Sequence, residues 1–196
     1  MGSTPIAATD FLVLDMEMTG LDPDRDEIIE LAAVPTSGLE MGTGDAFYSI
    51  VRPDRNIPAK TKEIHGMTGK ELAEAPPLEE VLPYLLKMLH GRIVVGHNVA
   101  VDMEFLRHKS RRTGKMPPKR PMVDTARLGS ALFPGRKTMS LDRLLAEFGM
   151  DRPRGKHDAL SDTILTARLF LKMIHELKAA GRLSTAGDIL KIGGTK

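Results

Sequence analysis

Two carboxylates interrupt an apolar run near the start of the sequence. Residues 11–18 read FLVLDMEM, and alternate residues of a strand face the same side, so Asp15 and Glu17 would share one face. The apolar residues on both sides of the run are typical of a central, buried strand. Neighbouring buried anions repel each other and lose hydration, at a cost of several kcal/mol, unless a positive group lies between them. The pair therefore indicates a nearby positive charge.

Two further acids lie on apolar helix faces later in the chain. Asp102 shares a face with Phe105 and Leu106 at three- and four-residue spacing, and Asp162 lines up with apolar side chains of the last long helix. Each acid alone is more simply explained as a helix cap or a structural salt bridge. Four inward-facing acids, however, have too few inward-facing Lys or Arg residues to balance them. Hard divalent cations are the natural partners, and two such ions about 4 Å apart suit phosphoryl transfer.

The size and composition of the chain limit the class of protein. Its 196 residues suit one globular domain, and the absence of Cys excludes disulfides, thiolate metal sites and thiol nucleophiles. No apolar run is long enough to span a bilayer, and the first ten residues lack the pattern of a signal peptide. We therefore expect a soluble, cytoplasmic protein.

The formal net charge of +2 hides an uneven distribution. Residues 1–100 carry 8 Lys or Arg and 16 Asp or Glu, whereas residues 101–156 carry 14 and 6. A basic middle segment next to an acid-rich first half fits an anionic polymer held near a cation site. On charge alone, ordinary solvated helix faces are the simpler explanation.

The order of the predicted elements indicates a mixed-sheet α/β domain. Three strand-like runs come first, at residues 11–18, 27–34 and 46–53, and an antiparallel meander is their simplest arrangement. Alternating helices and short strands follow, ending in a long amphipathic helix over residues 158–181. The predicted division is a flexible N-terminus, one folded domain and a loosely ordered C-terminal tail: residues 1–8, 9–181 and 182–196.

Three short segments resemble the motifs of a known enzyme family. DMEMTGL, HNVAVD and HDALSD stand in the order and context of the motifs of the DEDDh (DnaQ-like) 3′→5′ exonucleases. Over about residues 9–180 the chain resembles the proofreading epsilon subunit of bacterial DNA polymerase III and its stand-alone relatives. One such motif would be weak evidence, but three at these separations are strong. The resemblance implies a ribonuclease H-like fold, with a mixed β-sheet, a three-strand antiparallel meander and helices on both faces.

The resemblance also implies chemical roles for five residues. It makes Asp15, Glu17, Asp102 and Asp162 the ligands of two divalent metal ions, Mg²⁺ or Mn²⁺. It makes His157 the general base that takes a proton from the attacking water, and the ordinary His pKa of about 6.5 suits that task. Without Asp162 five residues later, His157 would simply be a hydrogen-bonded residue at the start of a helix.

A further set of residues is expected near the terminal nucleotide, also from the resemblance. These residues are Met16, Met18, Thr19, Ile64, His65, Asn98 and Val101. Simpler alternatives stay open: Thr19 can begin a turn, His65 can be an ordinary loop residue, and Asn98 can hold the loop before the helix.

Two departures from the family pattern concern this nucleotide pocket. Val101 stands where the family usually has an aromatic residue, and Met18 stands where Thr is common. A base stacked on an aromatic side chain gains ~1–3 kcal/mol, so the pocket can be looser or shaped for another end. With only 6 Phe, 2 Tyr and no Trp, we expect affinity to come mainly from phosphate contacts and to fall with salt. The candidate contacts are Arg107, Lys109, Arg111, Arg112, Lys115, Arg152, Arg154 and Lys156.

The leading hypothesis is a metal-dependent 3′→5′ exonuclease that releases nucleoside 5′-monophosphates from single-stranded or frayed DNA. The nearest alternative is RNA, because related enzymes trim RNA 3′ ends or degrade short oligoribonucleotides. A non-catalytic nucleic-acid-binding scaffold is a third reading, although the four acids and His157 are all present. A DNA polymerase is the candidate protein partner, but the tail shows no obvious docking segment, which favours a free-standing enzyme. No membrane partner is expected.

Overall fold

The fold was determined from a computed structural model. The residues it describes are 2–42, 46–55, 66–117, 119–136, 139–152 and 158–195. Three residues predicted to act at the site lie outside these ranges: Ile64, His65 and His157. The basic candidates Arg154 and Lys156 lie outside them as well.

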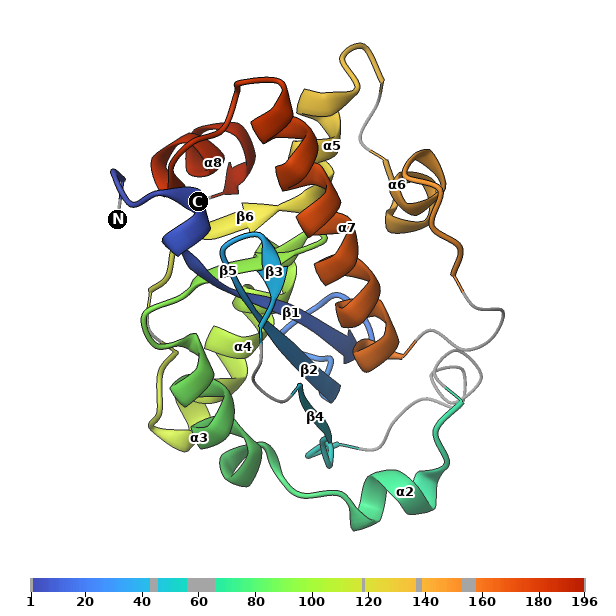
Figure 1. Cartoon of the computed structure of the whole chain (residues 1–196). Helices are drawn as coiled ribbons and strands as arrows, with labels where there is room; N and C mark the ends of the chain where they lie inside the picture. The colour runs from blue at the N-terminus through green and yellow to red at the C-terminus, as the bar shows by residue number, and fades with distance from the viewer. Residues whose placement is uncertain are drawn as a thin grey trace.

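A mixed sheet of seven strands forms the centre of the described part of the chain (Figure 1). The strands are β1 (Asp10–Met18), β2 (Ile28–Ser37), β3 (Glu40–Met41), β4 (Phe47–Ile50), β5 (Ile93–Gly96), β6 (Met122–Asp124) and β7 (Gly194–Thr195). Their order is β3-β2-β1-β5-β6-β7, and β4 also pairs with β2. The β1–β2 and β2–β4 pairs are antiparallel, whereas β1–β5 and β5–β6 are parallel. The predicted antiparallel meander within a mixed sheet is therefore confirmed.

Helices cover both faces of this sheet, as predicted. They are α2 (Gly69–Glu74), α3 (Leu78–Leu89), α4 (Val99–Ser110), α5 (Thr125–Leu132), α6 (Leu141–Glu147), α7 (Ala159–Ala179) and α8 (Ala186–Gly193). Two short 3₁₀ turns are η1 (Ile6–Ala8) and η2 (Arg111–Thr113). The long helix α7 crosses one face of β1 and β2, and α3 and α4 pack on the other (Figure 1).

The side chains of β1 alternate between two buried cores. Phe11 and Val13 belong to the core under α7, whereas Leu12 belongs to the core under α3 and α4. Asp15 and Glu17 continue the first series, so they face α7 at the end of the strand. The predicted sharing of one face by these two acids is confirmed.

The two ends of the chain differ from the sequence prediction. We expected flexible ends over residues 1–8 and 182–196. Instead, the Ile6 N–H donates a hydrogen bond to the Ser184 carbonyl at 2.9 Å, and α8 forms with Ile189 fully buried. Both ends of the chain lie beside α8 (Figure 1). A helix this short is unstable alone, and the sequence pattern did not reveal that α8 packs against α5.

A compact hydrogen-bond network holds the turn that follows β1. The Thr19 hydroxyl donates to Asp26 Oδ1 at 3.1 Å and accepts from the Glu27 N–H at 2.9 Å. The Thr19 N–H in turn donates to the Glu27 carbonyl at 2.9 Å. A Cβ on Gly20 would lie 2.4 Å from the Asp26 carboxylate, so any other residue would push that carboxylate out of its place in this network. The Thr-Gly pair therefore shapes the turn, as the simpler reading of Thr19 anticipated.

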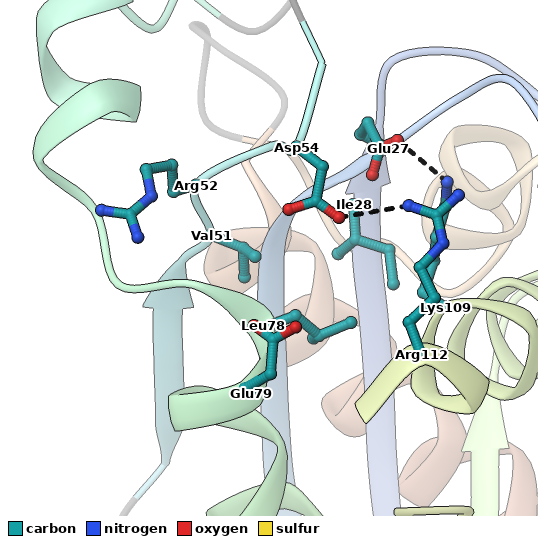
Figure 2. Close-up of a pocket in the computed structure, with 9 residues that line it drawn as sticks. All are labelled: Glu27, Ile28, Val51, Arg52, Asp54, Leu78, Glu79, Lys109 and Arg112. Carbon is teal, nitrogen blue, oxygen red and sulfur yellow. Dashed lines mark hydrogen bonds and ion pairs between the residues drawn. The ribbon is translucent and has the colours of Figure 1, made fainter. Parts of the chain in front are cut away.

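A buried ion pair joins the same turn to the end of α4 (Figure 2). Lys109 Nζ lies 3.1 Å from Glu27 Oε1, and the two side chains are only 3% and 8% exposed. Beside it, Arg112 pairs with Asp54 at 3.2 Å nearer the surface, and a cavity of about 20 Å³ lies among these side chains. Because its ammonium is buried against Glu27, Lys109 is not an exposed phosphate contact. The pair instead fixes α4, which carries Asp102, against the turn after β1.

We predict that Lys109→Met lowers the free energy of unfolding by up to about 3–5 kcal/mol, because the buried Glu27 carboxylate then keeps only the half-exposed Arg55 guanidinium, at 3.8 Å. The double variant Glu27→Met/Lys109→Met should regain most of the loss. Urea unfolding measures both. Arg112→Met is the matched control, since its partly exposed pair should contribute less than about 1 kcal/mol. Equal unfolding midpoints for Lys109→Met and the wild type would contradict the prediction.

Candidate active site

Three of the four predicted acids meet where β1 ends and α7 begins. One carboxylate oxygen from each of Asp15, Glu17 and Asp162 lies within 4.8 Å of the other two. Asp162 is buried in the first turn of α7, and the two acids of β1 are half-buried. This donor set of carboxylate oxygens fits a hard divalent cation.

Asp102 lies in the first turn of α4, near enough for its charge to act on Asp15. It is 5% exposed, and a backbone hydrogen bond from Met16 reaches its carboxylate. Burial first, and then the charges of neighbouring acids with Asp102 foremost, raise the pKa of Asp15 well above its ordinary value. The structure thus brings three of the four predicted acids within 4.8 Å of one another, and Asp102 lies close enough for its charge to act on Asp15.

The raised pKa of Glu17 shows that the negative charges of this site repel one another. Burial raises the pKa of Glu17 to about 8, and the charge of Glu30 contributes most among its neighbours. Glu30 is the residue directly opposite Glu17 in the β1–β2 ladder. Without a bound cation, Glu17 therefore retains its proton at neutral pH.

A cation from the chain itself reaches the cluster. The guanidinium of Arg152 contacts the carboxylate of Asp162, and its Nε lies 2.6 Å from Asp142 Oδ1 on α6. Its charge lowers the pKa values of Asp15 and Glu17, against the larger effects that raise them. From the sequence, we expected Arg152 to be a candidate contact to a substrate phosphate. The structure instead places its side chain, which is 17% exposed, between two acids.

The turn before α4 is held by an acid that the sequence reading did not single out. Asn98 has a left-handed backbone, with φ 60° and ψ 34°, and its N–H donates to Asp124 Oδ1 at 3.2 Å. The same oxygen of Asp124 accepts from the Ala126 N–H at 2.8 Å and so begins α5. These contacts fit the structural alternative for Asn98, in which it sets the entry to the helix that carries Asp102.

The other predicted substrate contacts remain predictions. The Met16 side chain is buried in the core under α3 and α4, so a nucleotide could meet only its backbone. Met18 is half-buried, and the Thr19 hydroxyl is engaged within the turn. Val101, which precedes Asp102, is 37% exposed and can contact a ligand from the first turn of α4.

Sequence reasoning also missed a second buried acid near this site, Glu30. Glu30 is 3% exposed, and its Oε2 accepts a hydrogen bond from the Ala159 N–H at 2.8 Å. Its Oε1 accepts from the Tyr48 hydroxyl at 3.3 Å. The signal was present in EIIELAAV, where an acid interrupts an apolar strand just as Asp15 does in the preceding one.

Comparison with known proteins identifies the family. A family model described as "Exonuclease" (RNase_T) matches residues 12–170. The chain belongs to this exonuclease family. The match spans the three motifs, and the predicted kinship with the DEDDh, DnaQ-like exonucleases is confirmed.

Two relatives share more than a third of their aligned residues with the chain. A DNA polymerase III subunit epsilon-like protein of Rhodobacter capsulatus is 38% identical over 192 residues, covering 97% of this chain and 27% of that protein. The DNA polymerase III subunit epsilon of Aquifex aeolicus is 36% identical over 167 residues, covering 85% of this chain and 81% of that protein. The chain therefore spans about a quarter of the first relative and most of the second.

Solved structures share the fold. Exonuclease X in complex with 5′ overhanging duplex DNA has a TM-score of 0.68 and 27% identity, covering 93% of this chain and 98% of its own. The nuclease domain of 3′hExo, a DEDDh family member, has a TM-score of 0.75 at 19% identity, covering 86% and 93%. The predicted ribonuclease H-like architecture is therefore confirmed. Among the described residues, we find no helix that is both long and apolar enough to cross a membrane.

We predict that the metal-free protein loses stability as the pH rises from about 5 to about 8. The pKa of Glu17 is about 8 in the folded state, against an ordinary value of 4.5, so in this window the folded state binds more protons than the unfolded state. The loss should be on the order of a few kcal/mol. Urea unfolding in EDTA at several pH values measures it.

Glu17→Gln should weaken this pH dependence, because glutamine cannot titrate, while Asp15, whose pKa is also raised, keeps part of it. Glu176→Gln, an exposed acid at the far end of α7, is the matched control and should keep the wild-type slope. An unfolding free energy of the wild type that is constant across this pH range would contradict the prediction.

Proposed function

We propose that this chain is a metal-dependent 3′→5′ exonuclease that hydrolyses the terminal phosphodiester bond of single-stranded or frayed DNA and releases nucleoside 5′-monophosphates. The observation that carries the proposal is the meeting of Asp15, Glu17 and Asp162, with Asp102 beside them, in a member of an exonuclease family. Three carboxylates within 4.8 Å of one another, with the charge of a fourth acid acting on them, are costly to bury unless they bind cations.

The acids fit two divalent ions, Mg²⁺ or Mn²⁺, held by Asp15, Glu17, Asp102 and Asp162. When bound, such ions would make the attacking water more acidic and stabilise the charge that develops on the phosphate. In this proposal His157 takes the proton of the water as its oxygen bonds to phosphorus. The bond from phosphorus to the 3′ oxygen of the preceding nucleotide then breaks, and that oxygen takes a proton from solvent water.

DNA is the preferred substrate in this proposal, and RNA is the alternative. The names of the relatives, DNA polymerase III subunit epsilon and its epsilon-like protein, favour DNA. Exonuclease X, at 27% identity, was solved with duplex DNA, which favours the same polymer. The names of the relatives also make a DNA polymerase the proposed protein partner. A scaffold without activity is disfavoured, because the acidic cluster is intact.

We predict that Asp162→Asn reduces cleavage to the background seen with EDTA while the protein stays folded. The substitution keeps the shape of the side chain but removes a ligand charge, and it relieves repulsion within the cluster. The measurement uses 5′-labelled DNA and RNA oligonucleotides of one sequence, with Mg²⁺, Mn²⁺ or EDTA. A ladder that shortens from the 3′ end is the expected wild-type product, and the faster polymer identifies the substrate class.

Glu176→Gln again serves as the control for Asp162→Asn, because it changes the same helix far from the cluster. Its cleavage rate should equal that of the wild type. Substantial turnover by Asp162→Asn would refute the assignment of this acid. If neither polymer is shortened by the folded wild type, the scaffold reading replaces the enzyme.

We predict that His157→Ala lowers the cleavage rate by roughly 10²–10⁴-fold, the range typical of a lost general base. Oligonucleotide binding, measured by fluorescence anisotropy, should change little. His175→Ala, an exposed histidine further along α7, is the matched control and should cleave normally. Near-normal cleavage by His157→Ala would mean that another group accepts the proton.

A further inference from the structure

Glu30 connects three separate elements around the acidic cluster. It lies on β2, its Oε2 accepts from the first N–H of α7 at Ala159, and its Oε1 accepts from Tyr48 on β4. The distances are 2.8 Å and 3.3 Å, and the residue is 3% exposed. Both oxygens of one carboxylate therefore have a partner.

The position of Glu30 in the sheet is electrostatically unfavourable. It stands directly opposite Glu17 in the antiparallel ladder, where paired side chains share a face and their Cβ atoms lie about 4.5–5.5 Å apart. Its negative charge repels that of Glu17 and contributes to the raised pKa of Glu17. A residue that merely filled this space would be better if apolar, so the carboxylate must contribute something that outweighs the repulsion.

The contribution lies at the start of α7. The first N–H groups of a helix have no partner within the helix, and Ala159 is fully buried, so water cannot supply one. Glu30 accepts from Ala159, while Asp158 accepts from the Ser161 N–H at 2.8 Å. Two acids thus accept hydrogen bonds from N–H groups in the first turn of α7, and their negative charges interact favourably with the helix dipole.

The contact of Glu30 with Ala159 also fixes where Asp162 lies. Asp162 follows Ala159 by three residues, about 4.5 Å along a helix axis, so a shift of the helix start moves Asp162 by a similar amount. A displacement of about 1 Å can cost an enzyme 10²-fold in rate.

Tyr48 holds the carboxylate of Glu30 from the opposite side. Burial, together with the charge and hydrogen bond of Glu30, raises the pKa of Tyr48 to about 12. The hydroxyl therefore stays protonated and remains a donor at neutral pH. Because β4 is itself paired to β2, this donor is anchored in the sheet.

We infer that Glu30 is a positioning residue of the active site: its carboxylate holds the start of α7 against the sheet and thereby sets Asp162 in place beside Asp15 and Glu17. The inference rests on the proposed function and extends it to a residue outside the four acids and the histidine. Glu30 acts through the hydrogen bond that the length of its side chain allows it to accept from Ala159, and not through its negative charge.

Two conservative variants separate the effect of the side-chain length of Glu30 from the effect of its negative charge. Glu30→Asp keeps the charge but is one methylene too short to hold both partners. Glu30→Gln keeps the reach, with its oxygen available to the Ala159 N–H and its amide able to donate to Tyr48. Thr36→Val is the matched control, because it changes another buried polar residue of β2, six residues from Glu30 and away from α7's start.

The readouts are the Mn²⁺ dissociation constant by calorimetry, and kcat and KM for a labelled oligonucleotide. Glu30→Asp should weaken Mn²⁺ binding and lower kcat, each by about 10–100-fold, with KM changed less than about threefold. Glu30→Gln and Thr36→Val should stay within about threefold of the wild type in all three. A role confined to stability would lower the unfolding midpoint of Glu30→Asp but leave its Mn²⁺ affinity and kcat unchanged.

That stability-only result would overturn the inference, and so would damage by Glu30→Gln as large as that by Glu30→Asp. The test is separable from that of the proposed function. A wild type that binds Mn²⁺ but cleaves nothing would defeat the exonuclease proposal, while the Mn²⁺ affinities would still decide on Glu30. A wild type that cleaves, with both variants unaffected, would defeat the Glu30 inference alone.

Discussion

Repulsion between buried carboxylates is the constraint on which the rest of this structure depends. Burial already disfavours the charges of Asp15, Glu17 and Asp102, and the charges of neighbouring acids add to that cost. A loosely packed chain would relieve it by letting the acids move apart. The elements that carry them must therefore be held by contacts that owe nothing to the acids themselves. The edge-to-face contact of Phe11 with a ring on α7, at 5.0 Å between centroids, is one such apolar contact.

The remaining restraints lie at the ends of elements, where the acids are. Glu30 holds the start of α7, Asp124 holds the turn into α4, and the buried pair of Lys109 and Glu27 holds the turn after β1. Each restraint satisfies polar groups that the fold buries, so losing it costs more than the bond alone. Polar contacts at element ends thus fix direction and register, while the two apolar cores fix the layers.

The parts that could be predicted from sequence are those that local pattern determines. Alternation in FLVLDMEM located the faces of β1, and the long apolar stripe located α7. Glu30 could not be placed in this way, because its partner Ala159 lies 129 residues further along the chain and only the tertiary fold brings them together. The contact of Arg152 with Asp162 depends on the path of the chain between α6 and α7. Helix α8 was missed because its stability comes from packing and not from its own sequence.

Among the described residues, Arg152 shows how little positive charge the chain brings to its acidic side chains. One guanidinium brings one positive charge to a place where four carboxylates converge, and it is shared with Asp142. With Arg152 present, the pKa of Glu17 still stands at about 8, so protons supply the remaining compensation at neutral pH. A divalent cation would have to displace those protons, which couples its binding to pH. The same acids that resist burial therefore make the affinity of this site for cations increase as the pH rises.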